Sequence, residues 1–233
     1  MSSAHPHTTP STTQESDVLV LGGGLMGTTT AFFLRQHGKS VTLLERELVG
    51  RQASGPNFGN VRRQGRELHQ LPLANRARAV WGRLRELLGE DAEFVPYGHL
   101  RVCYTEKQAA IIDKPTHDVK PYGLRLEMQT AEQLRKRWGI FAPGVVAGSY
   151  SPEDGHANPR LAGPAFARAA RRAGANIVEH AEVLKVEHDG HGFAAHVECQ
   201  TAVRQVFQTV AVHFEAQHVG QADGQCGARC GGG

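Results

Sequence analysis

The stretch DVLVLGGGLMGTTT, residues 17–30, places three consecutive glycines directly after an apolar run. Glycine weakens any regular element that it enters, so its repeated use here indicates a backbone geometry that other residues cannot adopt. Residues 17–21 suit a strand buried on both faces, as in a parallel sheet. Ala31, Phe33 and Leu34 then recur at helical spacing. The stretch therefore predicts a strand, a tight turn and a helix.

The glycines of this turn have the spacing GxGxxG, formed by Gly22, Gly24 and Gly27. In dinucleotide-binding folds the first glycine permits the tight turn, the second lets a pyrophosphate approach the backbone, and the third lets helix and strand pack closely. The free amides at the start of the helix then face the anion. We therefore predict a Rossmann-like unit here, with a dinucleotide as its ligand.

An acidic residue follows at the distance that such a unit requires. The predicted helix ends near His37 and Gly38, and SVTLLER, residues 40–46, is typical of a second apolar strand. It reaches Glu45, roughly 20 residues beyond the turn. A carboxylate there accepts hydrogen bonds from both hydroxyls of an adenosine ribose and repels a 2′-phosphate, so NADP is disfavoured. The unit alone does not separate FAD from NAD, because both have an unphosphorylated ribose.

The chain after Glu45 does not begin another strand and helix. It enters LVGRQASGPNFGNVRRQGR, residues 48–66, which is rich in small and polar side chains. A loop that lies against a cofactor needs close backbone approach and hydrogen-bonding groups, and Ser54, Asn57 and Gly59 offer both. The same residues are also ordinary turn formers.

Residues 17–46, followed by ASGPNFGN at 53–60, resemble the start of the D-amino-acid oxidase family of FAD-dependent oxidoreductases. The nearest members by this resemblance are of the glycine oxidase, sarcosine oxidase and opine or proline dehydrogenase type. The resemblance implies that the loop runs along FAD toward its isoalloxazine ring and that the backbone of Val183 touches the adenine. The cofactor-binding residues expected on this basis are Gly22, Gly24, Leu25, Met26, Gly27, Glu45, Arg46, Ser54, Asn57, Gly59 and Val183.

The resemblance also implies the reaction. Enzymes of this type oxidise the CH–NH group of a small amine or amino acid, pass a hydride to the flavin, and release an imine that hydrolyses. Because the cofactor performs the difficult chemistry, no catalytic side chain needs to stand out, and we assign none. A partner subunit or an electron acceptor is a further possible partner.

Three arginines follow the small-residue loop, close to where the resemblance puts the substrate side of the flavin. Arg62 and Arg63 are the candidate substrate residues, with Arg66 next in line. A guanidinium there could hold the carboxylate of an amino acid through two hydrogen bonds. Arginine runs are also common on solvated faces, so both interpretations stay open.

The fold class expected is α/β: a parallel FAD-binding sheet in two parts, residues 17–70 and 149–200, around an inserted α+β substrate-side region at 71–148. Within the insert, the apolar spacing between Asn75 and Leu88 predicts a helix, with Trp81 in the core. YGHLRVCYT alternates like a strand. Two pairs, Thr105 with Gln108 and Thr130 with Gln133, have the spacing of a helix-starting capping box. After the insert, Asn158 and Gly174 bracket a helix.

Both ends of the chain are expected to lie outside this fold. Residues 1–16 read as a disordered tail, and residues 201–233 as an aberrant or poorly ordered tail. The resemblance to the family stops at about residue 200, which suggests either a natural short form or a shifted reading frame; we favour the second. On this view the family residues that bind substrate are largely missing. The chain is then either an active enzyme or a truncated, inactive FAD-binding fragment, and an NAD-dependent dehydrogenase is a third, weaker alternative.

Composition bounds the remaining classes of function. The 233 residues are 40% hydrophobic and 21% charged, with a formal net charge of +3, which favours neither nucleic acid nor an acidic partner. No apolar run approaches the roughly 20 residues of a membrane-spanning helix. Four cysteines without a CxxC pair predict neither a disulfide framework nor a metal site. A cytoplasmic location is expected.

Overall fold

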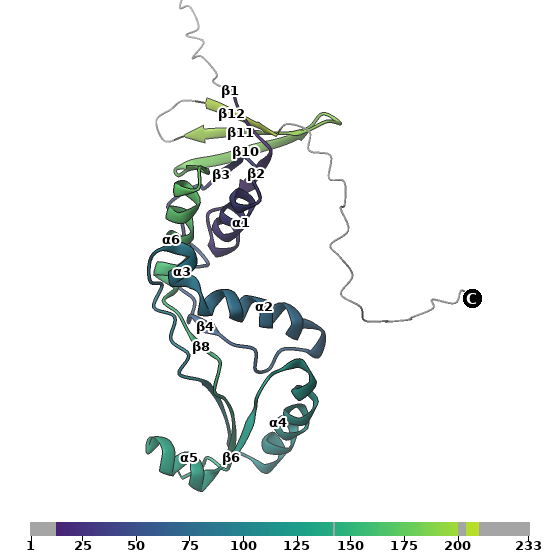
Figure 1. Cartoon of the computed structure of the whole chain (residues 1–233), viewed down its shortest axis with the longest axis vertical. Helices are drawn as coiled ribbons and strands as arrows, with labels where there is room; N and C mark the ends of the chain where they lie inside the picture. Colours follow the sequence, from purple (N-terminus) through teal and green to yellow (C-terminus); the bar gives the residue numbers. More distant parts are fainter. Residues whose placement is uncertain (1–12, 142, 200–203, 210–233) are drawn as a thin grey trace, which may run out of the picture.

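The computed structural model describes residues 13–141, 143–199 and 204–209. Its elements form two regions along the long axis of the molecule, joined by a narrow middle (Figure 1). One region contains a three-stranded parallel sheet with its helices and a second sheet of four strands. The other contains an antiparallel sheet with two helices. The α/β class and the parallel sheet predicted from the sequence are confirmed.

The parallel sheet has the order β2–β3–β9, formed by Val18–Leu21, Val41–Leu44 and Asn176–Val178. All four residues of β3 are buried, as expected of a central strand covered on both faces. The turn at Gly22–Gly24 joins β2 to helix α1, Leu25–Gln36. The sheet thus places the glycine turn directly at the carboxyl end of its first strand.

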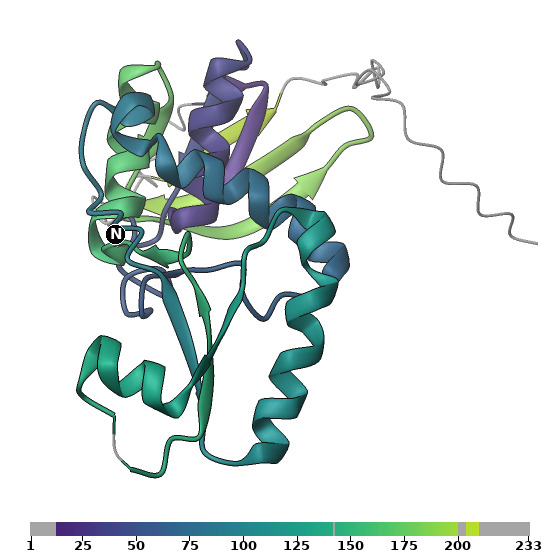
Figure 2. The ribbon, with the colours of Figure 1, turned by 60° about the horizontal axis from the view of Figure 1, so that its bottom comes forward.

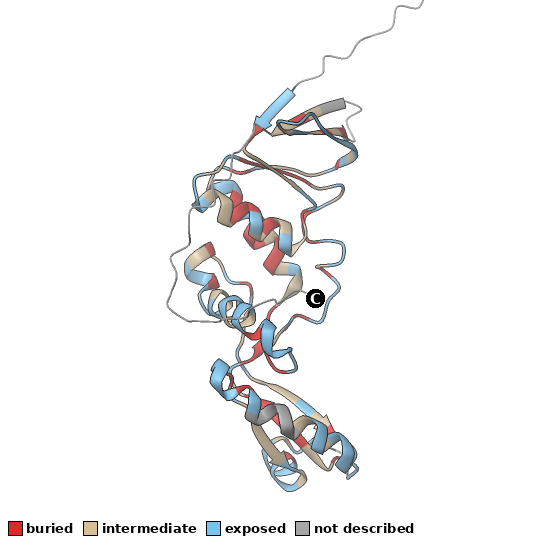
Figure 3. Ribbon diagram, turned by 90° about the vertical axis from the view of Figure 1, so that its right-hand side faces the viewer, coloured by how far each residue is buried: buried red, intermediate tan, exposed pale blue. Residues whose placement is uncertain are grey.

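Two helices cover one face of this sheet. Helix α6, Pro159–Arg172, packs against α1, and the rings of Phe32 and Phe166 meet edge to face with centroids 5.8 Å apart. Seven residues of α6 are buried, five of them alanines, so the two helix backbones approach closely. Figure 3 shows buried residues concentrated in this helical layer. The predicted start of α6 is confirmed, because the Asn158 side chain accepts a hydrogen bond from the amide of Arg160 at 3.0 Å.

A four-stranded sheet of order β1–β12–β11–β10 lies beside the parallel sheet (Figure 1). It corrects both tail predictions. Residues Thr13–Ser16 form strand β1, and Arg204–Thr209 form strand β12, which pairs in parallel with β1 and antiparallel with β11. The pairing buries Phe207 completely, and this apolar contact explains why both segments are ordered. The rest of both predicted tails lies outside the described residues.

The other two strands of this sheet, β10 and β11, span Ala181–His188 and Phe193–Cys199. Ala181, Ala195 and Val197 are buried with Phe207 against Leu44 of the parallel sheet. The four-stranded sheet and the parallel sheet therefore share one apolar cluster.

The narrow middle consists of chain segments that cross between the regions. Strands β4 and β8, Asn60–Val61 and Gly155–His156, pair antiparallel, and Val95 bridges to His156. These contacts leave no room at Gly155, where a side chain would overlap the backbone of Val95. The crossing is therefore tightly packed.

The second region is an antiparallel sheet of order β5–β7–β6, formed by His99–Cys103, Ala147–Ser151 and Glu127–Thr130. Helices α4, Glu106–Asp118, and α5, Ala131–Trp138, flank it (Figure 2). Strand β7 pairs with β5 as far as Ser151, so this region extends slightly past the predicted boundary at 148.

The helices of the insert differ in detail from the predictions. The helix expected from Asn75 to Leu88 begins earlier and divides into α2, Leu71–Gly82, and α3, Leu84–Leu88, because Arg83 leaves helical geometry. The capping box of Thr130 and Gln133 is confirmed. At the other pair, Thr105 caps Gln108, but the Gln108 side chain accepts from Tyr104 instead of Thr105, so the reciprocal half is shifted by one residue.

Two short 3-10 helices, Leu68–Gln70 and Lys120–Tyr122, complete the described elements. Within the described ranges no helix is long and apolar enough to cross a membrane. The same residues contain no group of three or more histidine, cysteine or acidic side chains arranged to hold a metal ion.

Candidate functional site

The glycine turn between β2 and α1 depends on its glycines in different ways. Gly22 has a φ of +98°, which L-residues rarely adopt. Gly27 has an ordinary φ, but a Cβ there would overlap the carbonyl oxygen of Gly22. The first glycine therefore sets the turn, and the third allows helix and strand to touch, as the spacing predicted.

Several amides at this turn are available to an anion. The backbone N–H groups of Gly24, Met26 and Gly27 donate to no residue that the structure describes, as is usual at the start of a helix. The amide of Leu25 donates to the Ser54 hydroxyl at 2.8 Å. Met26 is 79% exposed, so the turn is open to a ligand. Together with the positive end of the helix dipole, this cradle suits a pyrophosphate.

Glu45 lies beside the turn. Its carboxylate accepts hydrogen bonds from the amides of Gly23 at 2.6 Å and Glu47 at 2.8 Å. These two contacts fix the side chain where the carboxyl end of β3 meets the turn, and it is half-buried. A carboxylate in this position can accept from ribose hydroxyls while it anchors the turn. Arg46, the next residue, is exposed.

The start of β10 is hydrogen-bonded to the chain around Glu45. The amide of Ala181 donates to the Glu45 carbonyl at 2.8 Å, and that of His180 donates to the Glu47 carbonyl at 3.0 Å. Val183, two residues further, is half-buried against the cluster that contains Leu44. The structure therefore brings Val183 close to Glu45, although the two are far apart in sequence.

The small-residue loop is folded by its own polar groups. The Asn57 side chain donates to the Ser54 carbonyl and accepts from the Gly59 amide at 2.7 Å. Gly59 has a φ of +69°, and a side chain there would overlap the carbonyl of Ala157. The loop is therefore closed by turn contacts of its own side chains, and the Gly59 carbonyl accepts a hydrogen bond from the amide of Ala157, just before α6.

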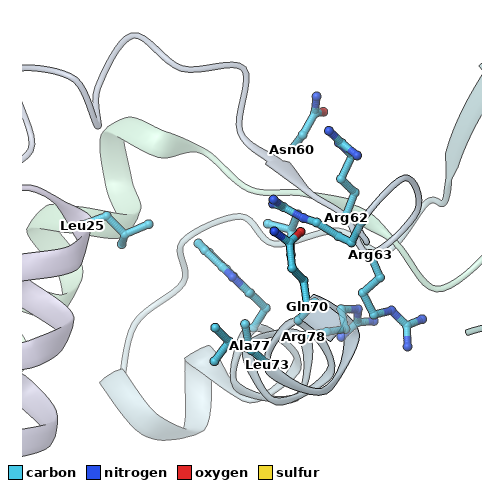
Figure 4. Close-up of a pocket in the computed structure, with 12 residues that line it drawn as sticks. Leu25, Asn60, Arg62, Arg63, Gln70, Leu73, Ala77 and Arg78 are labelled. Atoms are coloured by element: carbon cyan, nitrogen blue, oxygen red, sulfur yellow. The ribbon is translucent and has the colours of Figure 1, made fainter. Parts of the chain in front are cut away.

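Two cavities continue from the turn. A small one of about 80 Å³ is lined by Leu25, Ser54, Asn57 and Gly59. A larger one of about 460 Å³ lies between the arginine segment and α2 (Figure 4). Both are lined by Leu25, Asn60, Val61 and Trp81. One path thus leads from the glycine turn, along the small-residue loop, to the arginines.

Trp81 and Asn60 were not predicted as site residues. Trp81 was expected in the core, and it does contact the main apolar cluster, but it is half-buried and forms a wall of both cavities. Helical spacing indicates that a residue faces the interior of the protein. It does not show whether the residue packs in the apolar core or lines a cavity. For Asn60, the signal was its place within the small-residue loop, directly after Gly59.

The two candidate substrate arginines have different surroundings. Arg63 is buried, and its guanidinium forms ion pairs with Asp154 at 3.2 Å and with Glu153. Arg62 also lines the large cavity, and its Nη1 donates to the Gln64 carbonyl. No ion pair of Arg62 occurs among the residues that the structure describes. Arg62 therefore keeps a charge for a ligand, whereas the charge of Arg63 is already neutralised.

Asp154, which lies directly before β8, binds the arginine segment through several hydrogen bonds. Although its side chain is completely buried, its carboxylate accepts from the amides of Arg63 and Gln64, both at 2.9 Å, and from the Arg63 guanidinium. Gln64 continues the network by donating to Ser149 and contacting Nδ1 of His99 at 2.7 Å. Burial lowers the pKa of His99 and the nearby Arg62 lowers it further; Asp154 opposes this shift, and Arg101 adds a smaller lowering effect. The imidazole is therefore neutral near pH 7.

The glycine turn, the adjacent carboxylate and the elongated cavity define a dinucleotide-binding α/β protein. The family model of FAD dependent oxidoreductases, DAO, matches residues 17–221, and the chain belongs to this family. The match corrects the expectation that the resemblance ends at about residue 200.

Curated relatives and solved structures agree with this assignment. The chain is 27% identical over 227 residues to the glycine oxidase of Geobacillus kaustophilus, covering 94% of this chain and 57% of the relative. It is 30% identical over 174 residues to the 4-methylaminobutanoate oxidase (formaldehyde-forming) of Paenarthrobacter nicotinovorans, covering 74% and 21%. The structure of the L-amino acid deaminase of Proteus myxofaciens has the same fold, with a TM-score of 0.77 at 23% identity, covering 88% and 46%. The chain therefore spans 57% or less of the length of each of these proteins.

FAD is the cofactor of the family, and the residues present fit it. The cradle of free amides is kept open by the absence of a side chain at Gly24, where a Cβ would stand 3.0 Å from the Ser54 hydroxyl. The carboxylate of Glu45 suits the ribose, and the path past Ser54 and Gly59 suits the rest of an extended dinucleotide.

Proposed function

We propose that this chain binds FAD through the predicted residues and that the protein oxidises the CH–NH group of a small amine or amino acid. The observation that carries the proposal is the continuous path from the glycine turn to the arginine-lined cavity, with Leu25, Asn60, Val61 and Trp81 common to both cavities. Along this path lie free amides for the diphosphate, a carboxylate for the ribose and small residues for the middle of the dinucleotide.

The roles of the residues follow from their chemistry. Amides of Gly24, Met26 and Gly27 donate to the diphosphate, and Glu45 accepts from the ribose. Arg46, beside Glu45, and the backbone of Val183 border the adenosine end. Ser54, Asn57 and Gly59 border the middle of the cofactor, where their small size allows close approach.

The cavity of about 460 Å³ is the proposed reaction site. FAD, when bound, supplies a hydride acceptor for the carbon that bears nitrogen. The protein contributes an apolar wall to this cavity, formed by Leu73, Ala77 and Trp81. Arg62 holds the carboxylate of an amino-acid substrate by charge-assisted hydrogen bonds, while Arg63, fixed by Asp154, holds the backbone of Arg62 in place.

The names of the relatives support the choice of substrate class. The glycine oxidase and the 4-methylaminobutanoate oxidase are each named for a compound with an amine and a carboxylate. A cavity with an unpaired guanidinium at one end suits such compounds.

Flavin absorbance and calorimetry test this function. We expect the purified full chain to bind FAD with visible flavin bands, and Glu45→Ala to weaken the affinity about 30-fold, since hydrogen bonds to a charged group contribute about 2 kcal/mol. Glu47→Gln, which alters the neighbouring side chain but leaves the Glu45 carboxylate, is the matched control. Equal affinity of Glu45→Ala and Glu47→Gln would contradict the binding mode. Bleaching of the bound flavin by small amino acids or N-methylated amines tests turnover, and stable colour with all of them would contradict the oxidase activity.

A further inference from the structure

A second cavity lies next to the one assigned to the reaction. It has a volume of about 480 Å³, within the range of sites for small molecules, and it lies between the loop 64–68, helix α4 and the sheet β5–β7–β6. Arg66 lines both cavities, so the arginine segment contributes to each of them. The proposed function uses no other residue of this second cavity.

Two arginines converge on one glycine at the edge of this cavity. A methyl group at Gly65 would stand 3.1 Å from Nη1 of Arg62 and 3.2 Å from Nη1 of Arg101. Gly65 has a φ of +75°, so glycine is favoured there for conformation as well as for space. The two guanidiniums therefore border the same small volume, which is left free of side chains.

The positive charge at this place is not balanced by the described residues. Arg63, in the same segment, has two acidic partners, whereas Arg62, Arg66 and Arg101 form no ion pair with any residue that the structure describes. The half-buried ring of His99 is near this charge: its pKa is lowered first by burial and then by Arg62, with a smaller lowering by Arg101, while Asp154 raises it. The repulsion between guanidinium groups held close together is reduced when an anionic ligand binds between them.

The cavity also contains acidic groups. Glu67 and Asp118 line it together with Arg66 and Arg101, and neither acid is ion-paired with a described residue. A simple anion would be attracted by the arginines and repelled by these carboxylates. A small zwitterion suits both the basic and the acidic side chains, because its carboxylate can face the arginines while its ammonium group faces the acids.

We propose that this second cavity binds a free amino acid, with Arg66 and Arg101 on its carboxylate and Asp118 and Glu67 on its ammonium group. The site is separate from the flavin-side cavity, and the two share Arg66. An amino acid bound here would fix the arginine segment that also borders the reaction site, so the binding of a second amino acid and the binding of substrate would be coupled.

Calorimetric titration of the full chain with glycine, acetate and methylammonium tests the proposal. We expect glycine to bind at least tenfold more tightly than either acetate or methylammonium. Arg101→Gln should weaken glycine binding at least tenfold, and Asp118→Asn should reduce the affinity for glycine to that for acetate. Both side chains are exposed, so neither change removes core packing. Neither residue lines the flavin-side cavity, so a loss of glycine affinity in these variants would assign the bound glycine to the second cavity.

Arg85→Gln, an exposed arginine on α3, is the matched control and should leave glycine binding unchanged. Equal affinities for glycine and acetate, or unchanged glycine binding in Arg101→Gln, would overturn the proposal. The titration is carried out with and without FAD. Failure of the proposed function would appear as absent flavin binding, and it would leave the glycine titration without FAD unaffected.

Discussion

At the scale of the residue, the glycines of the turn at Gly22–Gly27 have separable physical roles. The sequence was sufficient to predict them because the motif is local: strand, turn, helix and the glutamate after the second strand are all defined within 30 residues of chain. The partner of Arg63 could not be predicted in this way, since Asp154 is 91 positions away and no spacing rule connects them. Residues whose role depends on a distant partner are therefore the ones that the sequence interpretation left open.

Alanine at Gly27 should abolish FAD binding and strongly lower stability, because its Cβ would overlap the carbonyl of Gly22. Gly38→Ala is the comparison: Gly38 has a positive φ but open space around it, so only strain of about 1 kcal/mol is expected. Thermal unfolding and FAD titration of both variants measure the difference. Similar losses in the two variants would argue against close helix–strand contact as the role of Gly27.

The half-buried His99 predicts a particular pH dependence of stability. Its pKa is lowered in the folded protein, so the unfolded chain binds a proton more readily near and below pH 6.5. The contribution of this histidine to stability is therefore present at higher pH and is lost as the pH falls below its unfolded pKa. His99→Asn keeps a polar group near Gln64 and removes the titration.

Urea unfolding of the wild type and of His99→Asn at pH 8 and pH 5 checks this prediction. The wild type should lose more free energy of unfolding between these two values than the variant does. The opposite order, with the variant losing more, would show that folding raises the pKa of His99.

At the scale of the element, the short strands β4 and β8 lie where the two regions meet, and directly beside them the Asp154 carboxylate accepts hydrogen bonds from the amides of Arg63 and Gln64. Local signals predicted several elements well, such as the capping box at Thr130 and Gln133, because both partners lie within one helical turn. They failed where pairing is remote, as for β1 and β12, since Thr13 faces Val206 across nearly the whole chain. For the insert, the family resemblance implied an α+β region with a mixed sheet; neither the antiparallel pairing of its strands nor the boundary at Ser151 was predicted.

Asp154→Asn should destabilise the protein by about 3 kcal/mol, because it leaves the buried guanidinium of Arg63 with one acidic partner, the more exposed Glu153. Glu153→Gln, whose carboxylate is half exposed, should cost less than about 1 kcal/mol. Chemical denaturation of the two variants provides the comparison. Equal costs would mean that Asp154 does not hold the crossing strands.

At the scale of the whole molecule, the four-stranded sheet joins the first described strand to the last. The N-terminal strand β1 runs parallel to β12, and Ser16 at its end is buried directly before the parallel sheet begins. The sequence suggested a tail at β1 because four residues of mixed polarity are too short to show a period. At β12 the residues from Val206 onward do alternate like a strand, but the apparent end of the family resemblance was given more weight.

Removal of residues 1–16 should therefore lower the free energy of unfolding by about 2 kcal/mol, since the hydrogen bonds of β1 with β12 contribute about 0.5 to 1.5 kcal/mol each. Removal of residues 1–12, which leaves β1 intact, is the control and should have little effect. Thermal unfolding of both shortened chains measures the difference. If they unfold at the same temperature, β1 makes no contribution to the stability of the sheet.

The parallel pairing of β1 with β12 also determines how the protein would respond to force. A pull applied to the start of β1 and to the end of β12 acts along the strands and loads all the hydrogen bonds between them in shear at once. We expect high resistance to stretching in this direction. In an optical trap, the same molecule held through the tip of the β10–β11 hairpin and the end of α6 should open at lower force, with its contacts separating one after another.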